Sequence, residues 1–184
     1  MKKLISCLSA IMLIFSLCSC SGSTNSTAPT SQETNPLVFD ISEYKADVSA
    51  YRDLTYQSSI ILANVGNYEN NYWKTLGRLS DDMSDRAFEW LAENSEETQE
   101  TVSASYEAIQ SAYGDLTSAD IDEEAEAAEI AAGVDALHVG YSALYELVTK
   151  PSGSREDFVR ALSDLINDVE AANDTLSNLL SEDE

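Results

Sequence analysis

The chain offers few of the side chains on which catalysis and metal binding usually depend. It contains one histidine, His138, and three cysteines, all of which lie within the first 20 residues. A two-metal helical bundle needs two Glu-x-x-His pairs and further glutamates, whereas the nearest pattern here, Asp135-Ala-Leu-His138, occurs once. The sequence has no phosphate-binding loop, nucleophile elbow or zinc-protease motif. We therefore expect a protein that is not an enzyme and that carries no cofactor or metal.

A candidate internal polar site comprises Glu69, His138 and Tyr141. Glu69 falls on the apolar stripe of a predicted helix, and counting residues from the predicted turns puts His138 and Tyr141 at a similar height on another helix. A buried carboxylate needs a partner or a shifted pKa, so this group could bind a small ligand or a proton. The sequence favours the alternative, in which Glu69 faces solvent and His138 is an ordinary boundary residue, because helix register is easily misplaced.

A candidate distal patch lies where the predicted topology gathers basic and aromatic side chains. Six of the eight basic residues that follow residue 20 fall near two predicted turns, 77–84 and 150–154. Arginine and tryptophan dominate binding hot spots, so this end could bind an anionic envelope polymer or a protein. The favoured alternative is that the tryptophans close the core and the arginines pair with nearby aspartates. The patch comprises Trp73, Arg78, Arg86, Trp90 and Arg155.

The N-terminal segment has the features of a secretory signal. Met1-Lys2-Lys3 is cationic, and residues 4–17 are apolar apart from small or weakly polar side chains. The alternative is a transmembrane anchor, which the length disfavours, because a spanning helix needs roughly 20 apolar residues. We therefore expect residues 1–19 to be a signal peptide.

The end of this segment, Leu17-Cys18-Ser19-Cys20, resembles the lipobox of bacterial lipoproteins. The resemblance implies cleavage after Ser19 and transfer of a diacylglycerol to the thiol of Cys20, with acyl chains such as palmitate. It further implies a chain held by lipid on the extracytoplasmic face of a bacterial membrane. Cys18 departs from the Ala or Ser that the family usually has at this position. The resemblance covers residues 1–20 only.

The charge of the chain restricts the partners it can take. Cleavage would remove 19 of 184 residues, leaving 165, and would take Lys2 and Lys3, so the net charge of −23 becomes −25. Nucleic acids and anionic headgroups repel so acidic a surface, and we expect the lipid on Cys20 to be the sole membrane contact. Cys7 and Cys18 would leave with the signal, so no disulfide can form within the mature chain.

Two regions follow the signal. Residues 20–36 carry the acylated cysteine and a Ser/Thr-rich stretch that predicts a flexible tether. In residues 37–184, apolar side chains recur every three or four positions, which indicates helices. Gly66, Gly133 and Gly140 fall on these stripes and would permit close packing, admit neighbouring aromatics or leave a cavity. The predicted helices span residues 41–76, 87–112, 117–148 and 154–179.

Capping motifs set the expected helix ends. Asp40-Ile-Ser-Glu43 and Ser154-Arg-Glu-Asp157 fit capping boxes, and Phe39 and Tyr44 fit a hydrophobic staple. We expect a break near Asn94, an end at Gly114 and a third helix capped by Thr117 or Ser118. Four helices with short turns predict an all-α, antiparallel up-down-up-down four-helix bundle.

These observations lead to two hypotheses about function. The first is a lipid-anchored, extracytoplasmic, non-enzymatic binding or interaction module at the cell surface. The alternative is a small-ligand or metal-binding bundle that serves sensing or delivery in an envelope system.

Overall fold

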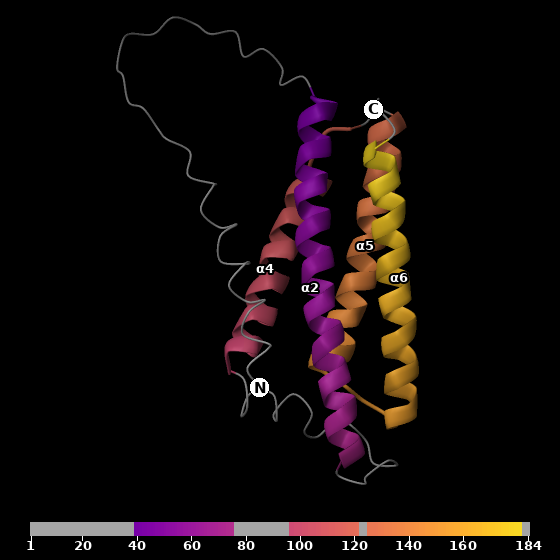
Figure 1. The fold of residues 1–184 in the computed structure, drawn as a ribbon. Coiled ribbons are helices and arrows are strands. Elements are labelled where there is room, and N and C mark those ends of the chain that lie inside the picture. The colour runs from indigo at the N-terminus through magenta and orange to yellow at the C-terminus, as the bar shows by residue number, and fades with distance from the viewer. Residues whose placement is uncertain (1–38, 76–95, 122–124, 182–184) are drawn as a thin grey trace, which may run out of the picture. The chain divides into compact units, whose positions relative to one another are not determined.

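Four helices make up most of the computed structural model, which describes residues 39–75, 96–121 and 125–181. No strand occurs in these described ranges, so the predicted all-α class is confirmed. All four helices belong to one unit, Val38–Glu184, and the colours of Figure 1 follow them in chain order, from indigo to yellow. The helices are α2 (Ile41–Thr75), α4 (Glu96–Thr117), α5 (Ala125–Thr149) and α6 (Arg155–Ser181).

Two helix starts are as the capping motifs predict. At α2, the Oδ1 atom of Asp40 accepts hydrogen bonds from the backbone amides of Ser42, at 2.9 Å, and Glu43, at 3.3 Å. The rings of Phe39 and Tyr44 lie 5.5 Å apart across this cap, as expected for a hydrophobic staple.

The start of α6 is capped by its own side chains. The Ser154 hydroxyl accepts a hydrogen bond from the Asp157 amide at 3.2 Å and donates one to the Asp157 carboxylate at 2.7 Å. Because capping contacts are local in sequence, they could be predicted without knowledge of the packing.

The connection between α4 and α5 differs from the prediction. Helix α4 does not end at Gly114 but continues to Thr117, because Leu116 packs into the core at 7% exposure. The hydroxyl of Thr117 donates to the carbonyl of Tyr113, and that of Ser118 donates to the carbonyl of Asp115. These hydroxyls therefore bond the end of α4 and do not cap α5, which begins at Ala125. The expected helix start at Ala87 and break near Asn94 lie outside the described residues.

The core runs along the predicted stripes, with α5 contributing more buried residues than any other described helix except α2. Buried side chains recur along α5 at spacings of one, three or four residues, so one face of this helix is enclosed by its neighbours. The largest side chains with almost no exposure are Tyr51, Tyr141, Phe158, Leu62, Ile109, Ile130, Leu137, Leu144, Leu176, Glu69 and Val48. No helix within the described ranges is long and apolar enough to cross a bilayer.

Glycines set the closeness of the α5–α6 and α2–α6 contacts. A Cβ atom on Gly140 would lie 3.2 Å from Val169, and one on Gly133 would lie 3.0 Å from Leu176. A Cβ atom on Gly66 would lie 2.8 Å and 2.9 Å from the two methyl carbons of Leu162. The glycines therefore permit close packing, as one interpretation of the sequence proposed, and they admit aliphatic side chains where the other proposed aromatics.

A pair of glycine substitutions tests this packing. Gly114 lies on an exposed part of α4, where an added Cβ meets nothing within 4 Å. We expect Gly114→Ala to raise the free energy of unfolding by about 0.5 kcal/mol, because alanine favours a helix. Gly66→Ala is expected to lower it by about 1–2 kcal/mol, because its Cβ overlaps Leu162. Urea denaturation followed by circular dichroism measures both, and equal stabilisation by the two variants would contradict the close contact.

Candidate functional site

His138 is the centre of a polar cluster that joins α2, α4 and α5. The hydroxyl of Tyr51 and the Nδ1 atom of His138 lie 3.1 Å apart, and the Nε2 atom lies 3.5 Å from the Ser142 hydroxyl. The ring of Tyr113 stacks on the imidazole with centroids 3.7 Å apart and an angle of 7° between the planes. We call Tyr51, Tyr113, Asp135, His138 and Ser142 the histidine cluster.

The protonation of the histidine cluster follows from burial. Burial strongly raises the pKa of Tyr51, so its phenol keeps its hydrogen and we assign it as the donor to Nδ1 of His138. The imidazole hydrogen then lies on Nε2, facing Ser142. Burial lowers the pKa of His138, and the nearby Asp135 carboxylate partly opposes this shift. His138 is therefore a neutral acceptor at ordinary pH, and its two nitrogens are engaged by other members of the cluster.

Further contacts tie the histidine cluster to α4. The Tyr113 hydroxyl donates to the Asp135 carboxylate at 2.9 Å, and the Gln110 amide donates to the Ser142 hydroxyl at 3.5 Å. The hydrogen bond to Asp135 is the main cause of the raised pKa of Tyr113. The cluster therefore links α4 to α5 through side chains that are spread over 33 residues of sequence.

A row of tyrosines continues from this cluster along α5. The hydroxyl of Tyr141 pairs with that of Ser58 at 2.9 Å. Burial raises the pKa of Tyr141 to about 12, although the hydrogen bond to Ser58 opposes the shift. Tyr106 of α4 stacks on Tyr145 at 3.8 Å and on Tyr141 at 6.3 Å. These contacts fix how α2 and α4 sit against α5.

Glu69 is turned into the protein, with a side chain that is 0% exposed. The favoured expectation that it faces solvent is therefore wrong. Neither carboxyl oxygen has a hydrogen-bond partner among the described residues. Burial raises the pKa of Glu69 to about 8, so the group holds its proton at neutral pH.

The structure does not bring Glu69 to His138. Tyr51, which contacts His138, precedes Glu69 by 18 residues on the same helix, a rise of about 27 Å. The offset of α2 along α5 explains why the predicted grouping of Glu69 with His138 is wrong. Gly66 already lies level with Val148, near the end of α5. Helix α2 thus continues past α5, and residue counts from the two predicted turns do not share an origin.

Glu69 lies instead near three other side chains that hold buried polar atoms without hydrogen-bond partners among the described residues. The unpaired atoms are both Glu69 oxygens, Asn70 Oδ1, Trp73 Nε1 and Arg155 Nε. Trp73 follows Gly66 by seven residues and Arg155 precedes its neighbour Leu162 by seven, so both lie about 10 Å along their helices from that contact. Figure 1 shows the start of α6 beside the later turns of α2. We call these four residues the Glu69 cluster.

The Glu69 cluster includes two members of the predicted distal patch. Trp73 is only 3% exposed, so its ring packs into the core and is not presented at the surface. Arg155 is half-buried. Arg78, Arg86 and Trp90 lie outside the described residues. The sequence missed Tyr51, Tyr113, Asp135 and Ser142 as members of the histidine cluster, and it missed Ser58 as the partner of Tyr141. The hydroxyl groups of Tyr51 and Ser58 on an otherwise apolar stripe were the available signal.

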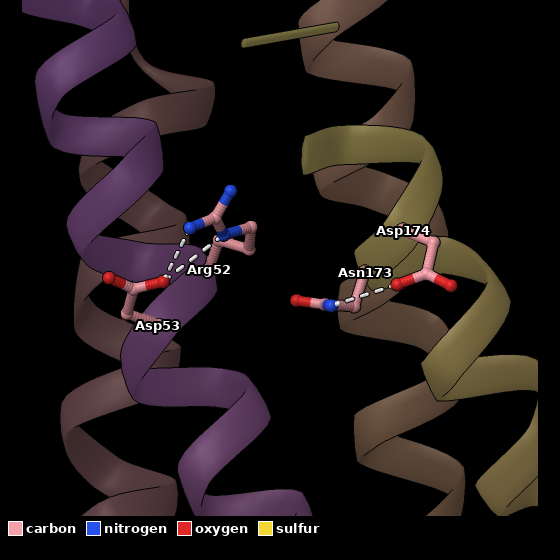
Figure 2. A network of polar contacts seen from close by, with 4 residues as sticks. All are labelled: Arg52, Asp53, Asn173 and Asp174. Carbon is pink, nitrogen blue, oxygen red and sulfur yellow. Dashed lines mark hydrogen bonds and ion pairs between the residues drawn. The ribbon is translucent and has the colours of Figure 1, made fainter. Parts of the chain in front are cut away.

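The α2–α6 side of the protein carries mostly local polar contacts. Arg52 pairs with its neighbour Asp53 at 2.7 Å, and Asn173 hydrogen-bonds its neighbour Asp174 at 3.5 Å. Figure 2 shows both pairs, with the Arg52 guanidinium turned back to Asp53 on α2 and Asn173 bonded to Asp174 on α6. In the part of the chain that the structure describes, no group of three or more His, Cys, Asp or Glu is arranged to hold a metal ion.

Comparison of the chain with protein-family models, curated proteins and solved structures gave no match. The proposed function of the helical domain therefore rests on the geometry of the histidine cluster and the Glu69 cluster.

Replacement of Glu69 by glutamine tests its burial. The folded-state pKa of about 8 exceeds the ordinary glutamate pKa of 4.5, so the unfolded chain releases this proton at lower pH than the folded chain does. Between these pH values Glu69 destabilises the fold increasingly, by about 1.4 kcal/mol per pH unit, and the effect is constant above pH 8. We expect the stability difference between Glu69→Gln and the unchanged protein to grow from pH 4.5 to pH 8 in urea denaturation. Glu129→Gln, at an exposed position of α5, should show no such trend, and a flat difference for Glu69→Gln would contradict the buried carboxyl.

Removal of the Tyr51 hydroxyl tests the histidine cluster. Tyr51→Phe leaves Nδ1 of His138 without its donor, and we expect the free energy of unfolding to fall by about 1–2 kcal/mol. Tyr68→Phe removes an exposed hydroxyl on the same helix and should change stability by less than about 0.5 kcal/mol. Thermal and urea unfolding measure both variants. If they behave alike, the Tyr51–His138 contact does not stabilise the fold.

Proposed function

We propose that the protein is a lipid-anchored, extracytoplasmic lipoprotein whose helical domain is a non-enzymatic interaction module. The anchor is supported by Leu17-Cys18-Ser19-Cys20 after a cationic and apolar segment. The mature protein would then hang from the outer face of a bacterial membrane by the lipid on Cys20, through the Ser/Thr-rich stretch that follows.

The domain we propose is an antiparallel, up-down-up-down four-helix bundle. Residue numbers increase together along the α2–α5 contacts, from Tyr51–His138 to Ser58–Tyr141, so these two helices run in the same direction. Helices α5 and α6 run in opposite directions, because Gly133 lies against Leu176 and the later Gly140 lies against the earlier Val169. Helices α4 and α5 also run in opposite directions. Tyr113 faces His138, Gln110 faces Ser142 and Tyr106 faces Tyr145. This set of directions supports the proposed topology.

The observation that supports the interaction role is that the side chains capable of chemistry form structural contacts with one another. His138, Asp135 and the tyrosines around them bond to one another across three helices, and so serve to hold those helices in register. A rigid domain of this kind presents its surface to a partner. That surface belongs to a chain with a net charge of −23, so we propose a protein with a basic contact region as the partner, in preference to an anionic polymer.

The second candidate function is binding of a small ligand for sensing or delivery. The Glu69 cluster favours it, because its four side chains, two of them half-buried, hold buried polar atoms without partners in the described structure. A polar ligand or ordered water would satisfy such atoms.

Substitution of the lipobox cysteine tests the anchor. We expect Cys20→Ser to abolish incorporation of labelled palmitate and to release the protein from the membrane fraction, because a serine hydroxyl does not accept the diacylglycerol. Cys18→Ser is the matched control, since the family commonly has serine at that position, and it should remain labelled and membrane-bound. Labelled Cys20→Ser protein, or loss of labelling in Cys18→Ser, would contradict the assignment.

Cross-linking of intact cells tests the interaction role. Lys45, Lys74 and Lys150 provide amines for the reagent, and we expect the anchored chain to form a covalent complex with a second protein. Recovery of the chain only by itself would argue against an interaction module.

A further inference from the structure

A half-open groove lies between α2 and α6, on the opposite side of α2 from its contact with His138. Its volume is about 210 Å³, and Leu144 of α5 forms part of its lining. The Ser59 hydroxyl in this groove donates to the carbonyl of Tyr56 at 2.7 Å, so it is already satisfied by the backbone. The remaining lining is largely apolar: Tyr56, Ile60 and Ala63 from α2, and Ile166 and Val169 from α6, with Asn64 and Glu170.

Exposed side chains of α2 form one wall of this groove. Ile60, at 42% exposure, is one of three large hydrophobic side chains that the described residues expose to this degree. Tyr56, Ile60 and Asn64 follow each other at intervals of four residues, so they lie along one side of the helix. The distance from Tyr56 to Asn64 along the axis is about 12 Å.

The lining of this groove includes one carboxylate, that of Glu170, and no lysine or arginine. The stretch 53–73 of α2 contains no lysine or arginine, and neither does the stretch 161–181 of α6. Arg52, at the edge, is paired with Asp53, as Figure 2 shows. Asp174 is exposed and follows Glu170 by four residues, so it lies on the same side of α6.

We propose that this groove binds a basic amphipathic helix of a partner protein. The apolar lining would receive the apolar face of that helix, and lysines or arginines at its margins would face the carboxylates of α6. A length of about 12 Å corresponds to about eight residues of helix. This inference rests on the proposed interaction role and names the site and the kind of partner.

The probe is a synthetic, labelled peptide of about 14 residues that contains only leucine and lysine, with leucines at helical spacing. Its binding to the full-length protein in detergent is measured by fluorescence anisotropy. A peptide of the same composition, with leucines placed so that no apolar face forms, reports purely electrostatic attraction to the acidic chain. We expect the amphipathic peptide to bind at least about fivefold more tightly than this control.

Matched substitutions locate the site. Ile60→Ser removes an exposed apolar side chain from the groove, and Val139→Ser removes one that is 68% exposed on α5. Glu170→Gln and Glu129→Gln likewise remove exposed charges in and away from the groove. We expect Ile60→Ser to weaken binding about fivefold and Glu170→Gln about twofold, with no change for the two α5 variants. Because all four sites are exposed, circular dichroism should show unchanged folding.

Several results would overturn the proposal. Equal binding of both peptides, or equal effects of the groove and α5 variants, would mean that the acidic surface attracts any cation. Butylammonium could also bind with the same dependence on Ile60 and Glu170, while the amphipathic peptide binds no better than its control. That result would make a small cation the occupant. Self-association that Ile60→Ser abolishes would make it a second copy of the chain. A protein that is anchored and cross-linked as proposed above, but that does not bind the amphipathic peptide, would keep its interaction role and lose this groove as the site.

Discussion

The enclosure of one face of α5 by the other three helices is the constraint on which this fold depends. Nine residues of α5, from Ala127 to Val148, are buried, and each large aliphatic side chain among them contributes about 1.5–3 kcal/mol by leaving water. Two of the nine are Gly133 and Gly140, which lie seven residues apart and bring α6 close. The side facing α2 and α4 instead carries His138 and Tyr141. Helix α5 therefore meets its neighbours in two ways, through close aliphatic packing and through paired polar groups.

The buried polar groups differ in how they are satisfied. Tyr51–His138 and Ser58–Tyr141 are matched pairs, and such pairs specify register because any axial slip would leave both partners unpaired. Glu69 has no such match in the described structure. It lies where α2 has passed the end of α5, so one of the helices that could have supplied a partner is no longer beside it. Retention of its proton is then the least costly state of the carboxyl at neutral pH.

The proposed function follows from where the chain places its charge and its apolar surface. The side chains that could take part in chemistry are directed inward and bond to one another, whereas the groove between α2 and α6 exposes Ile60 and is also lined by the Glu170 carboxylate. An acidic domain with an apolar groove would be repelled by anionic headgroups. A lipid on Cys20 would hold such a domain at the membrane without requiring its surface to bind lipid.

The sequence by itself determined the elements whose causes are local. The caps at Asp40 and Ser154 were readable because a side chain bonds backbone amides two or three residues away. The apolar stripes were readable because helical periodicity is independent of the partner helix. The all-α class followed from these two signals together.

Only the tertiary structure decided how the helices are shifted along one another. That shift placed His138 beside Tyr51 and separated it from Glu69, and it turned Trp73 into the core. It also carried α4 past Gly114 to bury Leu116. Axial position is set by the fit of side chains from distant parts of the chain, such as Leu162 against Gly66. No local pattern contains that fit, which is why Glu69 and His138 were found in the sequence but were grouped with each other, and the partners of His138 were not found.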